Sequence, residues 1–419
     1  MSIARIAAES IDVDRIRSSF PALASDTVFL ENAGGSQVPA VVADAMHRYL
    51  LNTYVQLGAG YELATECDRV IERAHEFINL LVNGANTGTV ILGPSCSQLC
   101  AMLAHCYGET LDPGDEIIVT EAGHEANVGP WVRLAESGFT VRTWKLDPQT
   151  FTCPPEDLRS LLTERTKVVA IVHVSNLLGE IVNVKEIAEM VHSAGARLVV
   201  DGVAYAPHRA IDVADWNVDW YAFSTYKVYG PHMAALYGKR DAIAELTGPN
   251  HFFIPRKEVP HKFELGGVNH EGCAGLNALG DYFRFLARFG DTGLDEEKPI
   301  DRRTIEDAFA VMAACELPVQ RHLIEYLLNK PSVRIIGPPH WEPARVGTVS
   351  FAHQSRSSAE IAAAAHRKNI GIRNGHMYAY RLCEALGMDP EDGVVRVSLV
   401  HYNTVEEIDR LIEILETVL

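Results

Sequence analysis

The chain has 419 residues, of which 47% are hydrophobic and 22% are charged, a balance typical of a soluble globular protein. This length predicts two or three domains, or one large α/β domain with a smaller partner. The formal net charge of −18 argues against nucleic acid or an anionic membrane as a partner bound through the overall electrostatic field.

The N-terminus, residues 1–20, mixes charged residues with isolated apolar ones, which predicts an amphipathic helix and neither a signal peptide nor a membrane span. Eight cysteines are scattered along the chain without a CxxC pair. Cys96, Cys100 and Cys106 lie close together, but their spacing fits no common zinc site. We therefore expect buried thiols in a reducing cytoplasm, and no metal.

Between about residue 70 and residue 240, short β-rich runs alternate with helical stretches. Strands are predicted at 88–93, 115–121, 167–175 and 197–202. Helices are predicted at 97–110, 130–138 and 184–195. Because the strand sequences are continuously apolar and helices separate them, we expect a mostly parallel sheet covered on both faces, which is an α/β fold.

The last hundred or so residues have a different character, after a change in composition near 265–300. Strands are predicted at 346–353 and 394–402, and helices at 357–369 and 406–419. These elements predict a small α+β domain at the C-terminus.

Polar residues follow the predicted strands of the first part. His124, Asn176 and Asp201 come at or after strand ends, and Lys227 ends the aromatic run that begins at Tyr221. Ligands of open α/β sheets bind beyond the carboxyl ends of the strands. A single strand-end Asp or Asn is often a helix cap or turn former, but this set of four types is hard to assign to capping.

Pyridoxal phosphate requires nearly this set of groups. It needs a lysine for a Schiff base, a carboxylate for its ring nitrogen, a ring to stack on it, and hydroxyls with helix N-terminal amides for its phosphate. Ser95 and Ser97 lie where a strand turns into a helix, without the GK[ST] of a Walker loop. A nucleotide-binding alternative of Rossmann or flavodoxin type lacks the GxGxxG turn.

Six blocks in order resemble the class V aminotransferase family of fold-type I pyridoxal-phosphate enzymes, in its cysteine desulfurase / selenocysteine lyase-like branch. The blocks are LENAGGSQVP (30–39), EAGHEANVGPW (121–131), HVSNLLGEI (173–181), VVDGVAYAPH (199–208), YAFSTYKVYGPH (221–232) and RVSLVHYNTVEEIDRL (396–411).

The family resemblance implies a large α/β domain over 31–280, with a mostly parallel, seven-stranded-type sheet between helices. It implies a small α+β domain built from 1–30 and 281–419, so that the N-terminal segment joins the C-terminal part. It also implies a homodimer in which the cofactor site lies near the subunit boundary.

The same resemblance assigns roles to individual residues. Lys227 would form the Schiff base and move the α-proton, Asp201 would pair with the ring nitrogen, and His124 would stack on the ring. The remaining cofactor contacts would come from Cys96, Ser97, Asn176, Ser224 and Tyr226, the last standing where the family has a histidine. The substrate amino acid would be bound by Asn32, Asn176, Tyr378 and Arg396.

Three departures from the family pattern bear on function. The glutamine that faces the cofactor's phenolate oxygen falls at Ala204, next to Tyr205. The threonine of a loop that reaches the neighbouring subunit falls at Gly267. Tyr378 occupies the position at which one group of desulfurases carries its nucleophilic cysteine, and Cys383, five residues later, is expected to pack on a helix.

These observations predict an enzyme that acts on an amino acid. Because no persulfide-forming cysteine is expected, the leading hypothesis is C–S or C–Se cleavage by β-elimination. The alternatives are a class V aminotransferase and an amino-acid epimerase of the isopenicillin N epimerase type. A non-catalytic pyridoxal-phosphate-binding protein is a more remote alternative.

Overall fold

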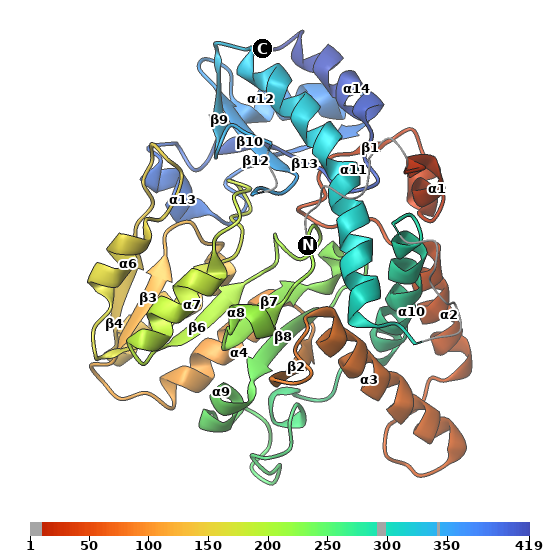
Figure 1. Cartoon of the computed structure of the whole chain (residues 1–419), viewed down its shortest axis with the longest axis vertical. Helices are drawn as coiled ribbons and strands as arrows, with labels where there is room; N and C mark the ends of the chain where they lie inside the picture. The colour runs from red at the N-terminus through yellow and green to blue at the C-terminus, as the bar shows by residue number, and fades with distance from the viewer. Residues whose placement is uncertain (1–10, 291–298, 342–343) are drawn as a thin grey trace.

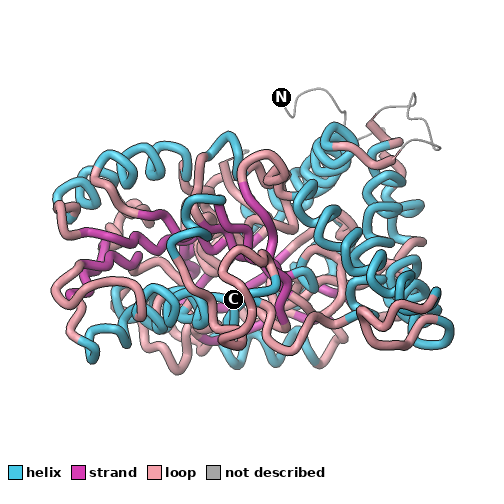
Figure 2. The backbone as a smooth tube through the Cα atoms, turned by 90° about the horizontal axis from the view of Figure 1, so that it is seen from below, coloured by secondary structure: helices cyan, strands magenta, loops and turns pink. Residues whose placement is uncertain are grey.

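A computed structural model of the protein describes residues 11–290, 299–341 and 344–419. Its centre is a seven-stranded sheet with helices on both faces (Figures 1 and 2). In spatial order the strands are β2 (Gly88–Gly93), β8 (Ala234–Lys239), β7 (Trp220–Ser224), β6 (Arg197–Asp201), β5 (Thr166–Val172), β3 (Glu116–Thr120) and β4 (Thr140–Trp144). Only the two pairings made by β8 are antiparallel, so the predicted mostly parallel α/β sheet is confirmed.

Alternation along the strands divides the buried side chains between two cores. Ile117 packs in the core that contains helix α4 (Cys96–Gly108), whereas the next residue, Ile118, packs in the core that contains helix α7 (Val184–Ser193). Shorter helices complete the two layers: α5 (Gly129–Arg133), α6 (Pro155–Leu161), α8 (Val213–Trp216) and α9 (Arg240–Glu245). Burial on both faces explains why the strands are apolar without a polar alternation.

The C-terminal part is built on a four-stranded antiparallel sheet with its own hydrophobic core. Its strands, in spatial order, are β12 (Arg373–Gly375), β13 (Val394–Ser398), β10 (Thr348–His353) and β9 (Val333–Ile336). Its helices are α12 (Ser358–His366), α13 (Tyr380–Ala385) and α14 (Val405–Leu415), and a short parallel pair joins β1 (Val28–Phe29) to β11 (Ile370–Gly371). The N-terminal segment thus pairs with the small part, as the fold prediction required.

Four longer helices lie beside one edge of the large sheet: α2 (Ala40–Asn52), α3 (Glu62–Leu81), α10 (His270–Ala287) and α11 (Arg302–Leu328). Helix α11 runs from this group to the small sheet (Figure 1), and its last turns pack in the core of that sheet. The domain limits 31–280, 1–30 and 281–419 remain a proposal, which the separate core of the small sheet supports.

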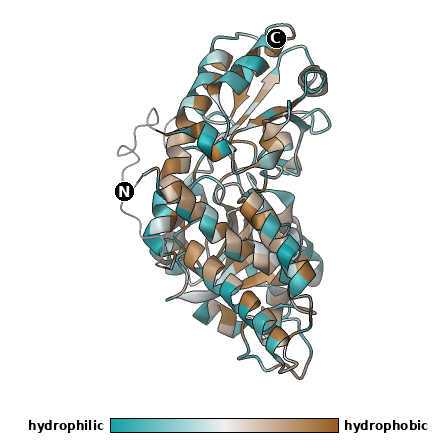
Figure 3. Cartoon of the chain, turned by 90° about the vertical axis from the view of Figure 1, so that its right-hand side faces the viewer, coloured by the Kyte–Doolittle hydropathy of each residue, from teal (hydrophilic) through white to brown (hydrophobic). Residues whose placement is uncertain are grey.

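Most helices carry hydrophilic and hydrophobic residues side by side (Figure 3). Helix α1 (Val13–Arg17) forms part of the predicted N-terminal helix, and residues 1–10 lie outside the described residues. Among the helices that the structure describes, none combines the length and the apolar character needed to cross a bilayer.

Candidate active site

The residues predicted to bind the cofactor surround a single cavity. It lies at the carboxyl ends of the adjacent parallel strands β5, β6 and β7 and at the N-terminus of α4. Eight predicted residues line it: Cys96, Ser97, His124, Asn176, Asp201, Ser224, Tyr226 and Lys227. Short apolar residues complete the walls, including Val172, Val174 and Val203. Sequence reasoning missed these valines because apolar residues at strand ends have the same pattern as core residues.

Lys227, which is partly buried, and Asp201, which is buried, both line this cavity. Burial lowers the pKa of the Lys227 amine to about 8; repulsion by Arg396 acts in the same direction, while Asp201 opposes it. Burial also raises the pKa of Asp201, whose Oδ1 accepts a hydrogen bond from the Val203 amide at 2.9 Å. The lysine is therefore far easier to deprotonate than an ordinary surface lysine.

His124 presents a neutral ring to the cavity. Burial, followed by the charges of Lys227 and Arg396, lowers its pKa to about 4. Its Nδ1 accepts a hydrogen bond from the Ala126 amide at 3.0 Å, which assigns the proton of the neutral ring to Nε2. An uncharged, oriented imidazole is well suited to stack on an aromatic ligand.

The N-terminus of α4 forms another wall. Ser95 is its N-cap and accepts a hydrogen bond from the Gln98 amide at 3.2 Å, and Cys96 and Ser97 form the start of the helix. The first-turn amides of a helix have no carbonyl partner within the helix and carry its positive dipole end. With the Ser224 side chain on the neighbouring strand end, this turn is suited to an anionic group such as a phosphate.

Arg396 comes to this region from β13 of the small part. Its side chain is buried, and Nη1 donates a hydrogen bond to the Asn176 carbonyl oxygen at 3.2 Å. Burial lowers the pKa of Arg396 to about 10. The Nε of Arg396 and the Oδ1 of Asn176 have no hydrogen-bond partner within the described ranges of the chain. Buried polar atoms without partners are rare in proteins and indicate a polar ligand here.

A segment of the small part, residues 376–381, is held against the cavity. The Asn176 amide donates to the Met377 carbonyl oxygen at 2.9 Å, and the Glu125 N–H donates to the Tyr378 carbonyl oxygen at 2.8 Å. The Tyr378 ring lies 5.2 Å from the His124 ring and is 63% exposed. Arg381 adds an ion pair to Glu125 at 3.0 Å, a contact that the sequence did not indicate.

This segment is also strained. Met377 and Tyr378 have φ angles of 42° and 62°, in the left-handed region that costs a non-glycine residue about 1–2 kcal/mol. Such strain persists where the surrounding structure dictates it, often at ligand sites. The conformation of Met377 and Tyr378 at the rim of the cavity is therefore imposed by their contacts with the large part of the chain.

Two other residues named in the sequence analysis, Asn32 and Tyr205, lie apart from the cavity walls. The Asn32 side chain is buried in a protein network, where it donates to the Ser398 carbonyl oxygen at 2.9 Å and accepts from Tyr402. Its amide is thus engaged by the protein itself, and its predicted contact with substrate has no support in this geometry. Tyr205 stacks on His173 at 3.7 Å and is not among the cavity residues, so it does not replace the missing glutamine at Ala204.

Cys383 is fully buried on helix α13, which confirms the prediction that it packs. Burial raises the pKa of its thiol to about 11. Gly267 lies in an exposed loop and makes no contact with the cavity. Within the described residues, no group of three or more His, Cys, Asp and Glu side chains is arranged to hold a metal ion.

The groups of this cavity fit pyridoxal phosphate: a partly buried lysine of lowered pKa, a buried carboxylate, a neutral ring and a helix N-terminus. Unpartnered polar atoms lie at Asn176 in its wall and at Arg396 beside Asn176. The fold and this site together define a pyridoxal-phosphate-dependent enzyme. The family model for aminotransferase class-V matches residues 28–291 and 305–411, and the chain belongs to this family.

Known proteins resemble the chain over nearly its whole length. The aminotransferase-like protein FGM3 of Gibberella zeae is 41% identical over 425 residues, which cover 99% of this chain and 100% of that protein. The cysteine desulfurase-like protein ustD of Aspergillus flavus is 32% identical over 415 residues, covering 95% of this chain and 88% of ustD. A cysteine desulfurase of Thermococcus onnurineus has the same fold, with a TM-score of 0.84, 24% identity and coverage of 96% and 97% of the two chains.

Proposed function

We propose that this protein cleaves the C–S or C–Se bond of a cysteine-type amino acid by β-elimination, without a persulfide on the enzyme. The proposal rests on Tyr378 at the rim of the cavity, where a phenol cannot accept a sulfur atom as a thiolate does. Cys96 lines the cavity, but the neighbouring Cys100 thiol and burial raise its pKa well above the usual range. Neither Cys96 nor the buried Cys383 therefore has the properties of a nucleophile.

In this proposal, Arg396 and Asn176 bind the substrate α-carboxylate, for which the arginine fork is suited. Lys227 accepts the Cα proton at Nζ, because its lowered pKa of about 8 leaves much of the amine neutral near that pH. When bound, the cofactor delocalises the negative charge left at Cα. The Cβ–S bond then breaks, the sulfur departs with the electron pair, and the released aminoacrylate hydrolyses to pyruvate and ammonia.

The remaining residues would hold the cofactor. Asp201 would pair with the ring nitrogen and His124 would stack on the ring, where its neutral state adds no charge. The phosphate would lie at the N-terminus of α4. It would be held there by Cys96, Ser97, Ser224 and Tyr226.

A panel of amino acids tests the proposed reaction. Cysteine, selenocysteine and S-conjugates of cysteine are incubated with the holoenzyme, and sulfide or selenide, pyruvate, other keto acids and optical rotation are followed. We expect sulfide and pyruvate in equal amounts from cysteine, without an added amino acceptor. Keto acid that forms only with an acceptor would establish an aminotransferase, and loss of optical rotation alone an epimerase. A cofactor spectrum that no amino acid changes would identify a non-catalytic binder.

The pH dependence of cofactor uptake follows from the pKa of Lys227. Only the neutral amine attacks an aldehyde, and below the pKa its fraction falls about tenfold per pH unit. We expect the rate of pyridoxal phosphate binding to the apoenzyme to rise with pH and to level off above about pH 8, where Lys227 is neutral. Stopped-flow absorbance between about pH 6.5 and 9.5 measures this rate. Nα-acetyllysine, whose only amine has a pKa of about 10.4, is the control, and its reaction with the cofactor should still accelerate at the highest pH. The same behaviour in the protein would contradict the prediction.

Substitution of Cys383 separates direct elimination from a persulfide relay. Cys383→Ala is expected to keep sulfide release within about twofold of the parent, because a buried thiol of raised pKa is inert. The loss of packing is expected to lower the free energy of unfolding by about 1 kcal/mol. Sulfide assays and denaturant unfolding measure the two quantities. A large loss of sulfide release in a folded variant would establish Cys383 as a sulfur acceptor.

We also propose a cytoplasmic homodimer. Exposed apolar side chains support an interface: Leu51 in the last turn of α2, Tyr54 just after it, and Phe252 and Phe253 on a loop, where Phe252 is 100% exposed in the single chain. All eight cysteines are free thiols, which supports a reducing compartment. Light scattering of the purified protein tests the dimer, and a monomer at micromolar concentration would refute it.

A further inference from the structure

A second cavity, of about 340 Å³, adjoins the candidate active site and has no part in the proposed reaction. The two cavities share Val172, at the end of β5. The inner wall is apolar and buried, with Trp144, Ile171 and Leu178 among its residues. This volume lies within the usual range of small-molecule sites, about 300–1,000 Å³.

Two carboxylates line this cavity, Glu180 and Glu186, and Glu186 accepts a hydrogen bond from the Asn183 side chain at 3.1 Å, whereas Glu180 stands without such a partner. The Glu180 side chain makes no hydrogen bond or ion pair in the part of the chain that the structure describes. Arg345 interacts with it only at a distance, because the Arg345 guanidinium donates to backbone carbonyl oxygens, including those of Leu178 and Thr348. Burial raises the pKa of Glu180 to about 7. A partly buried carboxylate without a partner is costly and favours a ligand that compensates it.

Two aromatic rings are fixed around the same space. The Trp144 ring N–H donates to the Pro154 carbonyl oxygen at 2.8 Å, which holds the indole in place. Phe151 has a φ of 59° in a tight turn that the Asp147 N–H closes by donating to the Thr152 carbonyl oxygen at 2.8 Å. A bulky residue in this conformation is strained, and such strain is typical of binding sites.

We propose that this cavity is a binding site for a small organic cation, a compact amine with an aromatic or branched aliphatic body. Its ammonium group pairs with Glu180, and its hydrocarbon part lies among Trp144, Phe151 and Leu178. Aromatic rings attract such cations and apolar walls accept the body. The formal charge of −18 on the chain also favours a cationic ligand over an anionic one.

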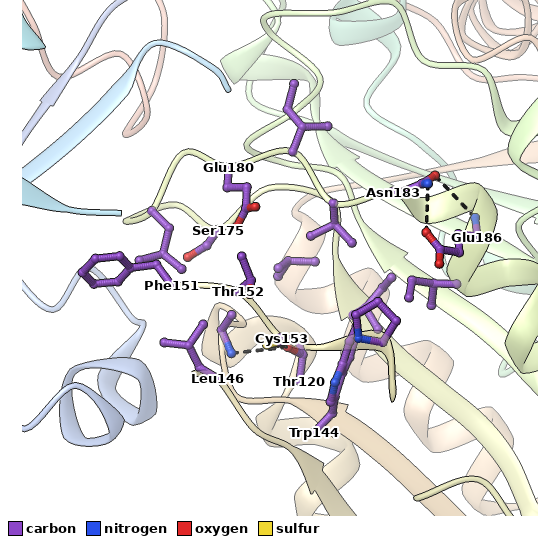
Figure 4. A pocket seen from close by; sticks show the side chains of 18 residues that line it. Thr120, Trp144, Leu146, Phe151, Thr152, Cys153, Ser175, Glu180, Asn183 and Glu186 are labelled. Atoms are coloured by element: carbon purple, nitrogen blue, oxygen red, sulfur yellow. Dashed lines mark hydrogen bonds between the residues drawn. The ribbon is translucent and has the colours of Figure 1, made fainter. Parts of the chain in front are cut away.

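The other polar groups of the cavity agree with this ligand. The Ser175 hydroxyl and the Thr152 side chain lie around the same space as Glu180 (Figure 4), where they can accept hydrogen bonds from an ammonium group. Ser175 precedes Asn176 of the candidate active site in the chain. A ligand here therefore contacts the same loop that carries Asn176, without entering the cofactor cavity.

The test uses N,N-dimethylbenzylamine, a tertiary amine that cannot form a Schiff base with the cofactor. Isothermal titration of the holoenzyme without amino acid is expected to give one saturable site. Glu180→Gln, which keeps the shape of the side chain, should weaken binding by tenfold or more. Benzyl alcohol, the uncharged control ligand, should bind more weakly than the amine and respond little to this substitution.

Two further variants keep the result decisive. Thr152→Trp adds bulk from the partly exposed rim and should abolish binding, whereas Glu156→Gln on the exposed start of α6 should leave it unchanged. The cofactor absorbance verifies that each variant is folded. Absence of binding to the parent protein, equal binding by Glu180→Gln, or binding that survives Thr152→Trp would overturn the proposal. Because no substrate is present, these results do not depend on the proposed elimination reaction.

Discussion

Replacement of Lys227 by alanine is expected to lower kcat by roughly 10²- to 10⁴-fold, the usual contribution of a positioned general base. Lys227 lies in the short turn that follows β7 and lines the cavity, and its pKa is lowered to about 8. The variant should also lose the absorbance of the covalently held cofactor. Steady-state kinetics and a spectrum of the purified protein measure both effects.

The matched control is Lys239→Ala. Lys239 lies at the end of β8 and donates a hydrogen bond to the Asn217 side chain, away from the cavity. This variant should retain both activity and spectrum. If Lys227→Ala retained the cofactor absorbance and the parent kcat, both the covalent anchor and the base would have to be another residue.

Substitution of Arg396 by methionine is expected to raise KM for the amino acid by about 30-fold or more, equivalent to about 2 kcal/mol or more. Methionine fills much of the buried space but leaves the substrate carboxylate without its partner. Arg396→Lys restores a charge without the bidentate fork, so its KM should lie between those of the parent and Arg396→Met. Initial rates over a range of substrate concentrations separate KM from kcat.

Arg373 provides the control for this effect. It is the register partner of Arg396 in the adjacent strand, but it is half-exposed and pairs with Glu31 at 2.7 Å. An exposed ion pair of this kind contributes about 0–1 kcal/mol, so Arg373→Gln should change KM by only a few-fold. Equal effects of the two substitutions would mean that overall positive charge, rather than the Arg396 contact, attracts the substrate.

Much of the large sheet is predictable from local sequence. The predicted strand at 88–93 coincides with β2, and the strand at 197–202 with β6, because residues buried on both faces form continuous apolar runs. Strand β4 escaped prediction since TVRTW is polar and only Trp144 is fully buried in it. Strand β8 escaped because AALYGK has few β-branched residues, and its pairing with β2 and β7 is a long-range contact.

The site residues at strand ends were also predictable, because parallel strands bring their carboxyl ends to the same edge. The contribution of the small part was not predictable from local sequence. Asn176 and Met377 are bonded across 201 positions of the chain, and the Glu125–Arg381 pair spans 256. For Asn32 the local sequence was misleading. It lies in a block that resembles the family and was predicted to bind substrate, but its side chain forms hydrogen bonds with the distant residues Ser398 and Tyr402 instead.

The sequence by itself determined the kind of chemistry, because the strand ends can be located from local patterns and the residues at those ends are read directly from the sequence. A lysine, a carboxylate, an imidazole and a helix start recur there in the arrangement that pyridoxal phosphate requires. Only the tertiary structure decided the state of these groups. The pKa of Lys227 depends on burial and on Arg396, which comes from another sheet, and the rim at Tyr378 depends on contacts between the two parts. Burial and electrostatic interactions are set by which distant residues come together, and no local pattern encodes them.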